Sequence, residues 1–120
     1  MTAEEWRRTV DAYVDECIGL RTPPRVTELA ARMGMSAVSL TRQLRTGLGM
    51  SGSQYIKERQ VAHAKQLLAE GNATLNEIAI AAGFGTARTF FRTFGRLTGS
   101  TPAAYRIMKK MSVASLEGHN

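Results

Sequence analysis

The sequence has few residues of the kinds that build disulfides and metal sites. Its 120 residues include one cysteine, two histidines and three prolines. A single cysteine, Cys17, excludes an internal disulfide and a cysteine-rich metal site. His63 and His119 lie far apart in the sequence, so we expect no histidine-based zinc site, no other metal and no cofactor.

Catalytic patterns are missing as well. We find no paired carboxylates on one helix face, no Cys–His pair and no glycine loop suited to holding phosphate. We therefore expect that the protein is not an enzyme. One alternative makes Cys17 a methyl acceptor, as in some repair proteins, but its place on an apolar helix face favours a small core residue.

The sequence also lacks long apolar runs. None approaches the ~20 residues that a membrane-spanning helix requires. The N-terminal MTAEEWRR has no apolar segment of the kind found in a signal peptide. We therefore expect a cytoplasmic protein that does not enter a membrane.

Positive charge is concentrated after the first 22 residues. Residues 1–22 contain three arginines against five acidic residues, whereas residues 23–120 contain thirteen Lys and Arg against five acidic residues. The net charge of the chain is +6. Such a surface suits a polyanion such as nucleic acid, although an anionic membrane surface would suit it too, and charge alone does not choose between them.

Seven segments show the spacing and the end signals of helices, and no segment alternates convincingly between polar and apolar residues. We therefore predict an all-α fold. The tail, residues 112–120, has little to pack against and we expect it to be flexible. The predicted helices are residues 4–19, 27–33, 37–48, 53–70, 75–82, 86–97 and 102–110.

The second and third of these helices are separated by a stop signal and a start signal. Gly34 suits the residue that follows a helix, and Ser36 suits the N-cap of the next one. Leu40 and Leu44, four residues apart, would face inward. This pattern predicts a tight helix-turn-helix.

The same pattern recurs about fifty residues later. The offset is 49 residues as far as the turn glycine and 50 residues after it. Any two helical hairpins could share glycines and apolar residues, but the shared arginine lies outside the apolar set, which favours duplication of one helix-turn-helix. The matched pairs are Glu28 and Glu77, Ala30 and Ala79, Gly34 and Gly83, Leu40 and Phe90, Arg42 and Arg92, Leu44 and Phe94, Gly49 and Gly99, and Tyr55 and Tyr105.

In a helix-turn-helix, the second helix enters the major groove and its N-terminal outward residues reach base edges. Arginine can bind guanine through two hydrogen bonds, and threonine or valine can contact a thymine methyl group. The alternative for each arginine is a solvated charged face or a salt bridge to Glu28 or Glu77, and Arg42 and Arg92 could also bind phosphate. The outward residues are Ala37, Val38, Thr41 and Arg42 in the first copy and Ala87, Arg88, Thr89 and Arg92 in the second.

The predicted spacer helix, residues 53–70, sets a geometric constraint. At ~1.5 Å per residue its length is roughly 27 Å, whereas successive major grooves on one face of DNA lie roughly 34 Å apart. A rigid spacer that is too short would bend the DNA or allow only one copy to bind. Of these two outcomes, bending of the DNA is our hypothesis.

The second half of the sequence resembles the signature region of the AraC/XylS transcription regulators. The pattern is I-A-x-x-x-G-F, then F-x-R-x-F, then G-x-T-P-x-x-Y-R, and the resemblance extends over about residues 26–109 with support from ELAARMGMS, LTRQL and ERQVAHAKQLL. The residues that carry the pattern are Ile78, Ala79, Gly83, Phe84, Phe90, Arg92, Phe94, Gly99, Thr101, Pro102, Tyr105 and Arg106.

The resemblance implies seven helices in two lobes: an N-terminal lobe (1–50), a linker helix (51–72) and a C-terminal lobe (73–111). It implies sequence-specific binding to promoter DNA in the bacterial nucleoid, with recognition helices in adjacent major grooves, and contact with RNA polymerase that usually activates transcription. The base-reading positions would be Val38, Thr41, Arg42, Arg88, Thr89 and Arg92. The expected backbone contacts are Ser36, Arg45, Arg96 and Lys57.

Two departures from the family pattern affect the second lobe. Gly95 replaces the usual lysine inside a helix, where glycine costs ~1 kcal/mol against alanine and a phosphate contact is lost. Gly85 stands where a serine-type cap is common, which predicts a looser helix start.

Three interpretations of the whole protein remain open from the sequence. The chain could be a stand-alone, monomeric regulator, or the DNA-binding fragment of a larger regulator that senses an effector. It could also be a nonspecific helical module for binding DNA or protein.

Overall fold

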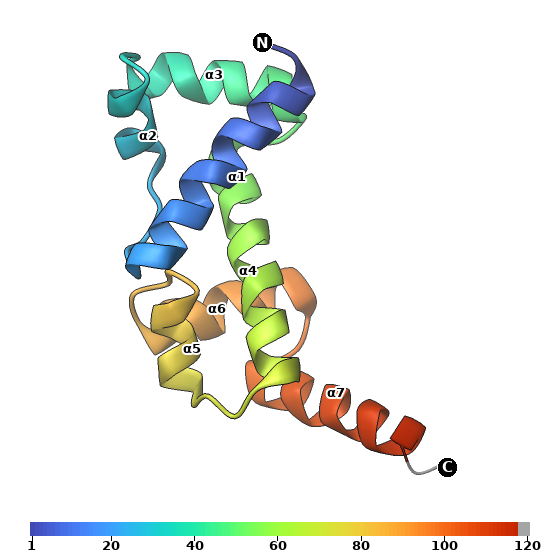
Figure 1. The fold of residues 1–120 in the computed structure, drawn as a ribbon. Coiled ribbons are helices and arrows are strands. Elements are labelled where there is room, and N and C mark those ends of the chain that lie inside the picture. Colours follow the sequence, from blue (N-terminus) through green and yellow to red (C-terminus); the bar gives the residue numbers. More distant parts are fainter. Residues whose placement is uncertain (118–120) are drawn as a thin grey trace.

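A computed structural model describes the backbone of residues 1–117 and the side chains of residues 1–112. Within that part of the chain all regular structure is helical (Figure 1), and the predicted all-α fold is confirmed. The helices are α1 (Ala3–Leu20), α2 (Val26–Arg32), α3 (Ala37–Leu48), α4 (Gly52–Glu70), α5 (Leu75–Ala81), α6 (Ala87–Thr98) and α7 (Pro102–Glu117).

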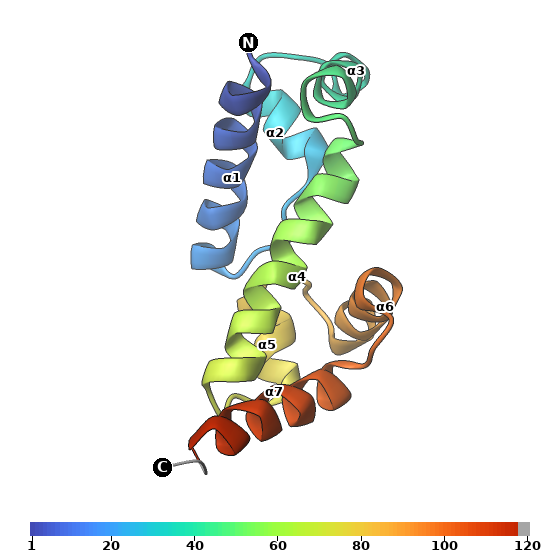
Figure 2. The same cartoon turned by 90° about the vertical axis from the view of Figure 1, so that its right-hand side faces the viewer.

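The helices form two lobes, each with its own buried apolar cluster. The first cluster lies among α1, α2, α3 and the start of α4, and the second among the rest of α4, α5, α6 and the turn that contains Phe84. Helix α4 runs between the lobes (Figure 2). It contributes Ile56 to the first cluster and Val61, Ala64 and Leu68 to the second.

The side chains that begin these helices follow the predicted pattern. Ser36 accepts a hydrogen bond from the backbone N–H of Ser39 at 3.1 Å, as an N-cap serine should. Thr74 and Glu77 form the predicted capping box at the start of α5. The loose start predicted for α6 is wrong, because Thr86 caps it by accepting a hydrogen bond from the N–H of Thr89 at 3.1 Å.

Helix α7 is longer than predicted. It continues to Glu117 instead of ending near Lys110, so residues 112–117 of the predicted tail are helical, and residues 118–120 lie outside the described part of the chain. The physical reason is that no glycine or proline occurs between Pro102 and Glu117 to stop the helix.

Two cations of α7 cap the C-terminal end of α4. The guanidinium of Arg106 donates to the carbonyl of Leu68 at 3.2 Å, and the ammonium of Lys110 donates to the carbonyl of Gly71 at 2.9 Å. These carbonyls belong to the last turn and the C-cap, which have no partners within the helix, and the helix dipole makes that end favourable for positive charge. Helix α7 is thereby held against α4.

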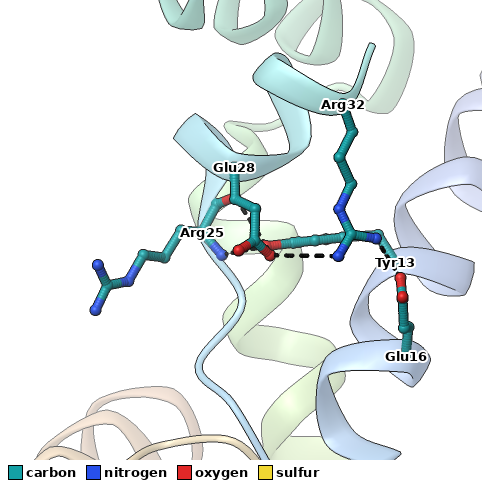
Figure 3. A network of polar contacts seen from close by, with 5 residues as sticks. All are labelled: Tyr13, Glu16, Arg25, Glu28 and Arg32. Carbon is teal, nitrogen blue, oxygen red and sulfur yellow. Dashed lines mark hydrogen bonds and ion pairs between the residues drawn. The ribbon is translucent and has the colours of Figure 1, made fainter. Parts of the chain in front are cut away.

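A network around Tyr13 joins α1 to α2 (Figure 3). The Tyr13 oxygen accepts from the backbone N–H of Arg25 at 2.9 Å, and its hydroxyl donates to the Glu28 carboxylate at 2.7 Å. Arg32 lies over the Tyr13 ring, 5.2 Å from its centroid, and forms ion pairs with Glu16 and Glu28. Burial raises the pKa of Tyr13, and its hydrogen bond to Glu28 adds to the rise.

A second tyrosine joins α1 to α4. The Tyr55 hydroxyl donates to the Asp11 carboxylate at 2.8 Å, and Arg59 binds the same carboxylate at 3.2 Å. Burial, with a contribution from the bond to Asp11, raises the pKa of Tyr55 to about 12. Together the two tyrosines tie the first helix to the other helices of its lobe.

Tyr13→Phe should lower the free energy of unfolding by about 1–2 kcal/mol, because it leaves the Arg25 N–H and the Glu28 carboxylate without their hydroxyl partner. Tyr55→Phe is the matched control and should cost about 0.5–1 kcal/mol, because Asp11 keeps its bond to Arg59. Urea denaturation measures both values. A Tyr13→Phe variant no less stable than Tyr55→Phe would show that the network does not secure α2.

Candidate nucleic-acid interface

Helices α3 and α6 lie on the same side of α4. Figure 2 shows both of them nearly end-on on one side of α4, with α1 on the other. In Figure 1 both cross the molecule in the same direction, α3 above α6. The two helices therefore run in roughly the same direction and are separated along α4. One rod-shaped partner could contact both.

The outer face of α3 carries the predicted residues of the first lobe. Val38 is 70% exposed, and Thr41, Arg42 and Arg45 are exposed as well. The opposite face of the helix buries Leu40, Leu44 and Leu48. Val38, Thr41, Arg42 and Arg45 thus share an accessible surface, and Ser36 lies at the start of the same helix.

The outer face of α6 carries three arginines. Arg88, Arg92 and Arg96 are exposed, whereas Phe90 and Phe94 are fully buried. Their spacing of four residues places them in one row along the helix. The structure therefore brings together the predicted arginines of the second lobe.

The arginines of α3 and α6 take part in none of the ion pairs found within the described residues, which involve Arg8, Arg32 and Arg59. The carboxylates considered as alternative partners are engaged elsewhere. Glu28 binds Tyr13 and Arg32, and Glu77 caps α5. The arrangement therefore does not support the salt-bridge alternative.

Thr89 differs from the other predicted base-reading residues. It is half-buried, and its hydroxyl accepts a hydrogen bond from the hydroxyl of Thr86 at 3.0 Å. Its backbone N–H also binds Thr86. Thr89 is thus part of the cap of α6, whereas Arg88 and Arg92 extend from the exposed face.

Phe91 is an exposed residue of this face that the sequence reasoning missed. It is 43% exposed and lies between Arg88 and Arg92 on α6. The 50-residue offset of the repeat pairs it with Thr41, so the repeat itself contained the signal. The ring adds an apolar surface to the helix that carries Arg88 and Arg92, which suits a partner with apolar groups of its own.

Lys57 lies apart from both recognition helices. It is half-buried on α4 and lines an open cleft of about 370 Å³ together with Arg25, Ser53 and Gln60. This cleft lies between α4 and the start of α2 with the connection before it. The structure therefore places Lys57 in a cleft with Arg25, a second cation that the sequence reasoning did not select.

Gly95 opens an apolar groove beside the arginine row. The groove has a volume of about 510 Å³ and is lined by Phe91, Gly95, Pro102 and Ala103, among others. A Cβ atom added to Gly95 would meet nothing nearer than the backbone oxygen of Ser100 at 3.9 Å, so a side chain fits there. The glycine is therefore not required by packing.

The described residues also bear on metal binding, on membrane crossing and on the alternative for Cys17. No cluster of three His, Cys, Asp or Glu side chains there could hold a metal ion. Over the same part of the chain, no helix combines the length and the apolar character needed to cross a bilayer. Cys17 is 1% exposed in the first apolar cluster, which disfavours the methyl-acceptor alternative.

Comparison with known proteins places residues 29–108 in a family described as helix-turn-helix domains. The chain is 32% identical over 81 residues to an HTH-type transcriptional regulator of Staphylococcus aureus, and 31% identical over 85 residues to the virulence regulon transcriptional activator VirF of Yersinia enterocolitica. These matches take in 68% and 71% of this chain. The chain spans only 11% of the length of the staphylococcal relative and 31% of that of VirF.

The fold also matches a solved structure in complex with DNA. This is the DNA-binding domain of the global transcriptional factor AdpA bound to a target DNA, with a TM-score of 0.75 and 29% sequence identity. The match covers 86% of this chain and 94% of the AdpA domain. Most of the fold is thus shared with a domain that was solved on DNA.

Gly95→Ala should raise the free energy of unfolding by about 1 kcal/mol, because alanine is the better helix former and its Cβ fits. Gly47→Ala is the matched control, since Gly47 lies near the end of the other recognition helix. A Cβ at Gly47 would lie 2.3 Å from the Trp6 ring, so this variant should be destabilised. Thermal or urea unfolding measures both; a Gly95→Ala protein less stable than the parent would contradict the packing argument.

Proposed function

The chain belongs to the AraC/XylS family of helix-turn-helix domains, and on that premise we propose that it is a DNA-binding unit that regulates transcription by recognising promoter sequences in double-stranded DNA. One observation carries the proposal: two repeated helices on one side of the molecule present exposed arginines that form no ion pair with the side chains of residues 1–112. Exposed arginines with free guanidinium groups suit both the bases and the phosphates of a duplex.

In the proposed complex α3 and α6 enter successive major grooves on one face of the duplex. The N-terminal half of each helix lies nearest the bases, and the helix before it supports the position across the backbone. Helix α4 is shorter than the roughly 34 Å that separates successive major grooves on one face of DNA. In the proposed complex the DNA therefore bends toward the protein. A phasing assay that shows straight DNA in the complex would contradict this bend.

The base-reading roles follow from the chemistry of the exposed side chains. Arg42, Arg88 and Arg92 each can donate two hydrogen bonds to one guanine, which is worth ~1–3 kcal/mol of discrimination. Val38 and Thr41 can contact thymine methyl groups. Thr89 remains in the proposal with a smaller part, since its hydroxyl is already bonded to Thr86.

Phe91 takes the position in the second lobe that Thr41 takes in the first. Its ring has no hydrogen-bonding group, so its contribution is apolar contact with a thymine methyl group or a sugar. The backbone contacts proposed for Ser36, Arg45, Arg96 and Lys57 hold the two helices in register without reading sequence.

The role of the whole protein extends the proposal further. The name of VirF, a transcriptional activator, supports activation, with contact to RNA polymerase in the cytoplasm. The chain spans a small part of the length of these relatives. It can act as a monomeric unit, or as the DNA-binding part of a larger effector-sensing regulator.

The proposal is tested by selecting duplexes from a random pool and titrating the selected duplex and a scrambled one by gel shift at two salt concentrations. We expect tighter binding to the selected duplex and a steep fall of affinity with salt, because phosphate contacts release counterions. Equal, weak binding to both duplexes would contradict sequence recognition and favour the nonspecific helical module.

Within this assay, Arg92→Ala should lower affinity for the selected duplex by about 10-fold or more and for the scrambled duplex by much less, because a base contact is lost. Arg8→Ala is the matched control, since Arg8 is an exposed arginine of α1 that pairs with Glu4. Equal losses on both duplexes would reassign Arg92 to the phosphate backbone.

Phe91→Ser should lower affinity for the selected duplex by about 5-fold, because about 1 kcal/mol of apolar contact is lost. Replacing the contacted thymine by uracil, which lacks the methyl group, should remove the difference between the variant and the parent. Ile80→Ser removes another exposed apolar side chain, 46% exposed on α5, and serves as the control. A variant as sensitive to uracil as the parent would exclude the methyl contact.

A further inference from the structure

The two lobes touch at a second place besides α4. The connection between α1 and α2 contains Thr22, Pro23 and Pro24, and it lies beside the turn between α5 and α6, which contains Gly83 and Gly85. Figures 1 and 2 both show these two segments next to each other at the middle of the molecule. Segments some sixty residues apart in the sequence therefore meet where the first lobe ends and the second begins.

The contact at Gly83 is tight, and a side chain there would require its neighbours to move by a few tenths of an ångström. A Cβ atom on Gly83 would lie 3.3 Å from the carbonyl oxygen of Thr22, from Cδ of Pro24 and from the Gln60 amide nitrogen. A Cβ atom on Gly85 would lie 3.4 Å from Cγ of Pro23. The backbone of the second lobe is thus packed directly on the backbone and the proline rings of the first.

Gln60 of α4 closes the junction from a third side. Its side chain is 5% exposed, and its amide nitrogen donates to the carbonyl of Ala82 at 3.1 Å. A buried hydrogen bond of this kind is costly to break, because the amide and the carbonyl would then lack partners. The linker helix is therefore bonded to the residue that precedes the turn glycine.

The repeat provides an internal comparison. Gly34 occupies the same turn in the first lobe, and its φ of +68° is similar to the +79° of Gly83. A Cβ atom on Gly34 would meet nothing within 4 Å. Both glycines are needed for the left-handed turn, but only the one in the second lobe also makes a contact between lobes.

We infer that the junction of Pro23 and Pro24 with Gly83 and Gly85, closed by Gln60, is a positioning device that sets the separation and orientation of α6 relative to α3. It thereby selects the spacing between the two half-sites on DNA. The inference rests on the proposed function. Its physical basis is that Gly83 and Gly85 lie directly before α6, so a shift of this turn moves the recognition helix itself, whereas α3 stays with the first lobe.

The consequence for binding follows from the linkage of the two helices. When α3 and α6 can reach their half-sites at the same time, the second contact is intramolecular and adds strongly to affinity. When the spacing of the half-sites does not match the separation of the two helices, this gain is lost, although each half-site contact is unchanged. The junction residues should therefore affect affinity only on duplexes that carry both half-sites.

The test uses a duplex selected from a random pool by the parent protein. From it one prepares duplexes with either half-site scrambled, and duplexes with one base pair inserted or removed between the half-sites. Affinities are measured for the parent, for Gly83→Ala and for Gly34→Ala. Gly34→Ala is the matched control, because it carries the same backbone strain at the equivalent turn without the contact between lobes.

We expect Gly83→Ala to lose affinity for the parental spacing by about 10-fold or more relative to Gly34→Ala. Its affinity for each half-site alone should match that of Gly34→Ala, and its preferred spacing should change. Identical spacing profiles for the two variants, with specific binding by the parent, would overturn the inference but leave the proposed function standing. A parent protein that binds all duplexes equally would overturn the proposed function itself.

A second variant covers the case in which Gly83→Ala does not fold, as judged by circular dichroism. Gln60→Met keeps the length of the side chain and removes the amide, so it loosens the junction instead of displacing it. We expect this variant to bind duplexes with altered spacing nearly as well as the parental spacing. A spacing preference as narrow as that of the parent would overturn the role of the junction.

Discussion

The packing of α4 into two separate apolar clusters is the constraint on which the rest of the structure depends. Ile56 completes the first cluster, and Val61, Ala64 and Leu68 complete the second. Neither lobe closes its core without this helix, so burial of apolar surface in both lobes also fixes the two lobes to one rigid rod. The placement of α3 and α6 on one side of the molecule follows from which faces of α4 each lobe covers.

The charge pattern complements this packing. Five of the ten acidic side chains are engaged in internal structure, in helix caps or with tyrosine and arginine side chains, while the arginines of α3 and α6 are exposed. An arrangement that satisfies its acids internally leaves positive charge free for an external polyanion. The carboxylates engaged in this way are Glu5, Asp11, Glu16, Glu28 and Glu77.

Much of the fold could be predicted because its signals are local. The cap at Ser36, the capping box at Thr74 and the inward Phe90 and Phe94 depend on residues within one or two helical turns, and all of them are confirmed. The failures have physical reasons too. The end of α7 was placed by an assumed lack of packing and not by a stop residue, and Phe91 was not selected although the repeat pairs it with Thr41.

The sequence alone was sufficient to predict the helices, the duplicated turn and the arginine-bearing faces, because periodicity and end signals act over a few residues. Only the folded chain shows the contact of the Pro23–Pro24 connection with the turn at Gly83, the hydrogen bond of Gln60, and the place of Lys57 in the cleft between α2 and α4. Each of these joins residues that are distant in sequence, and no local pattern records how two separately closed cores are oriented against one another.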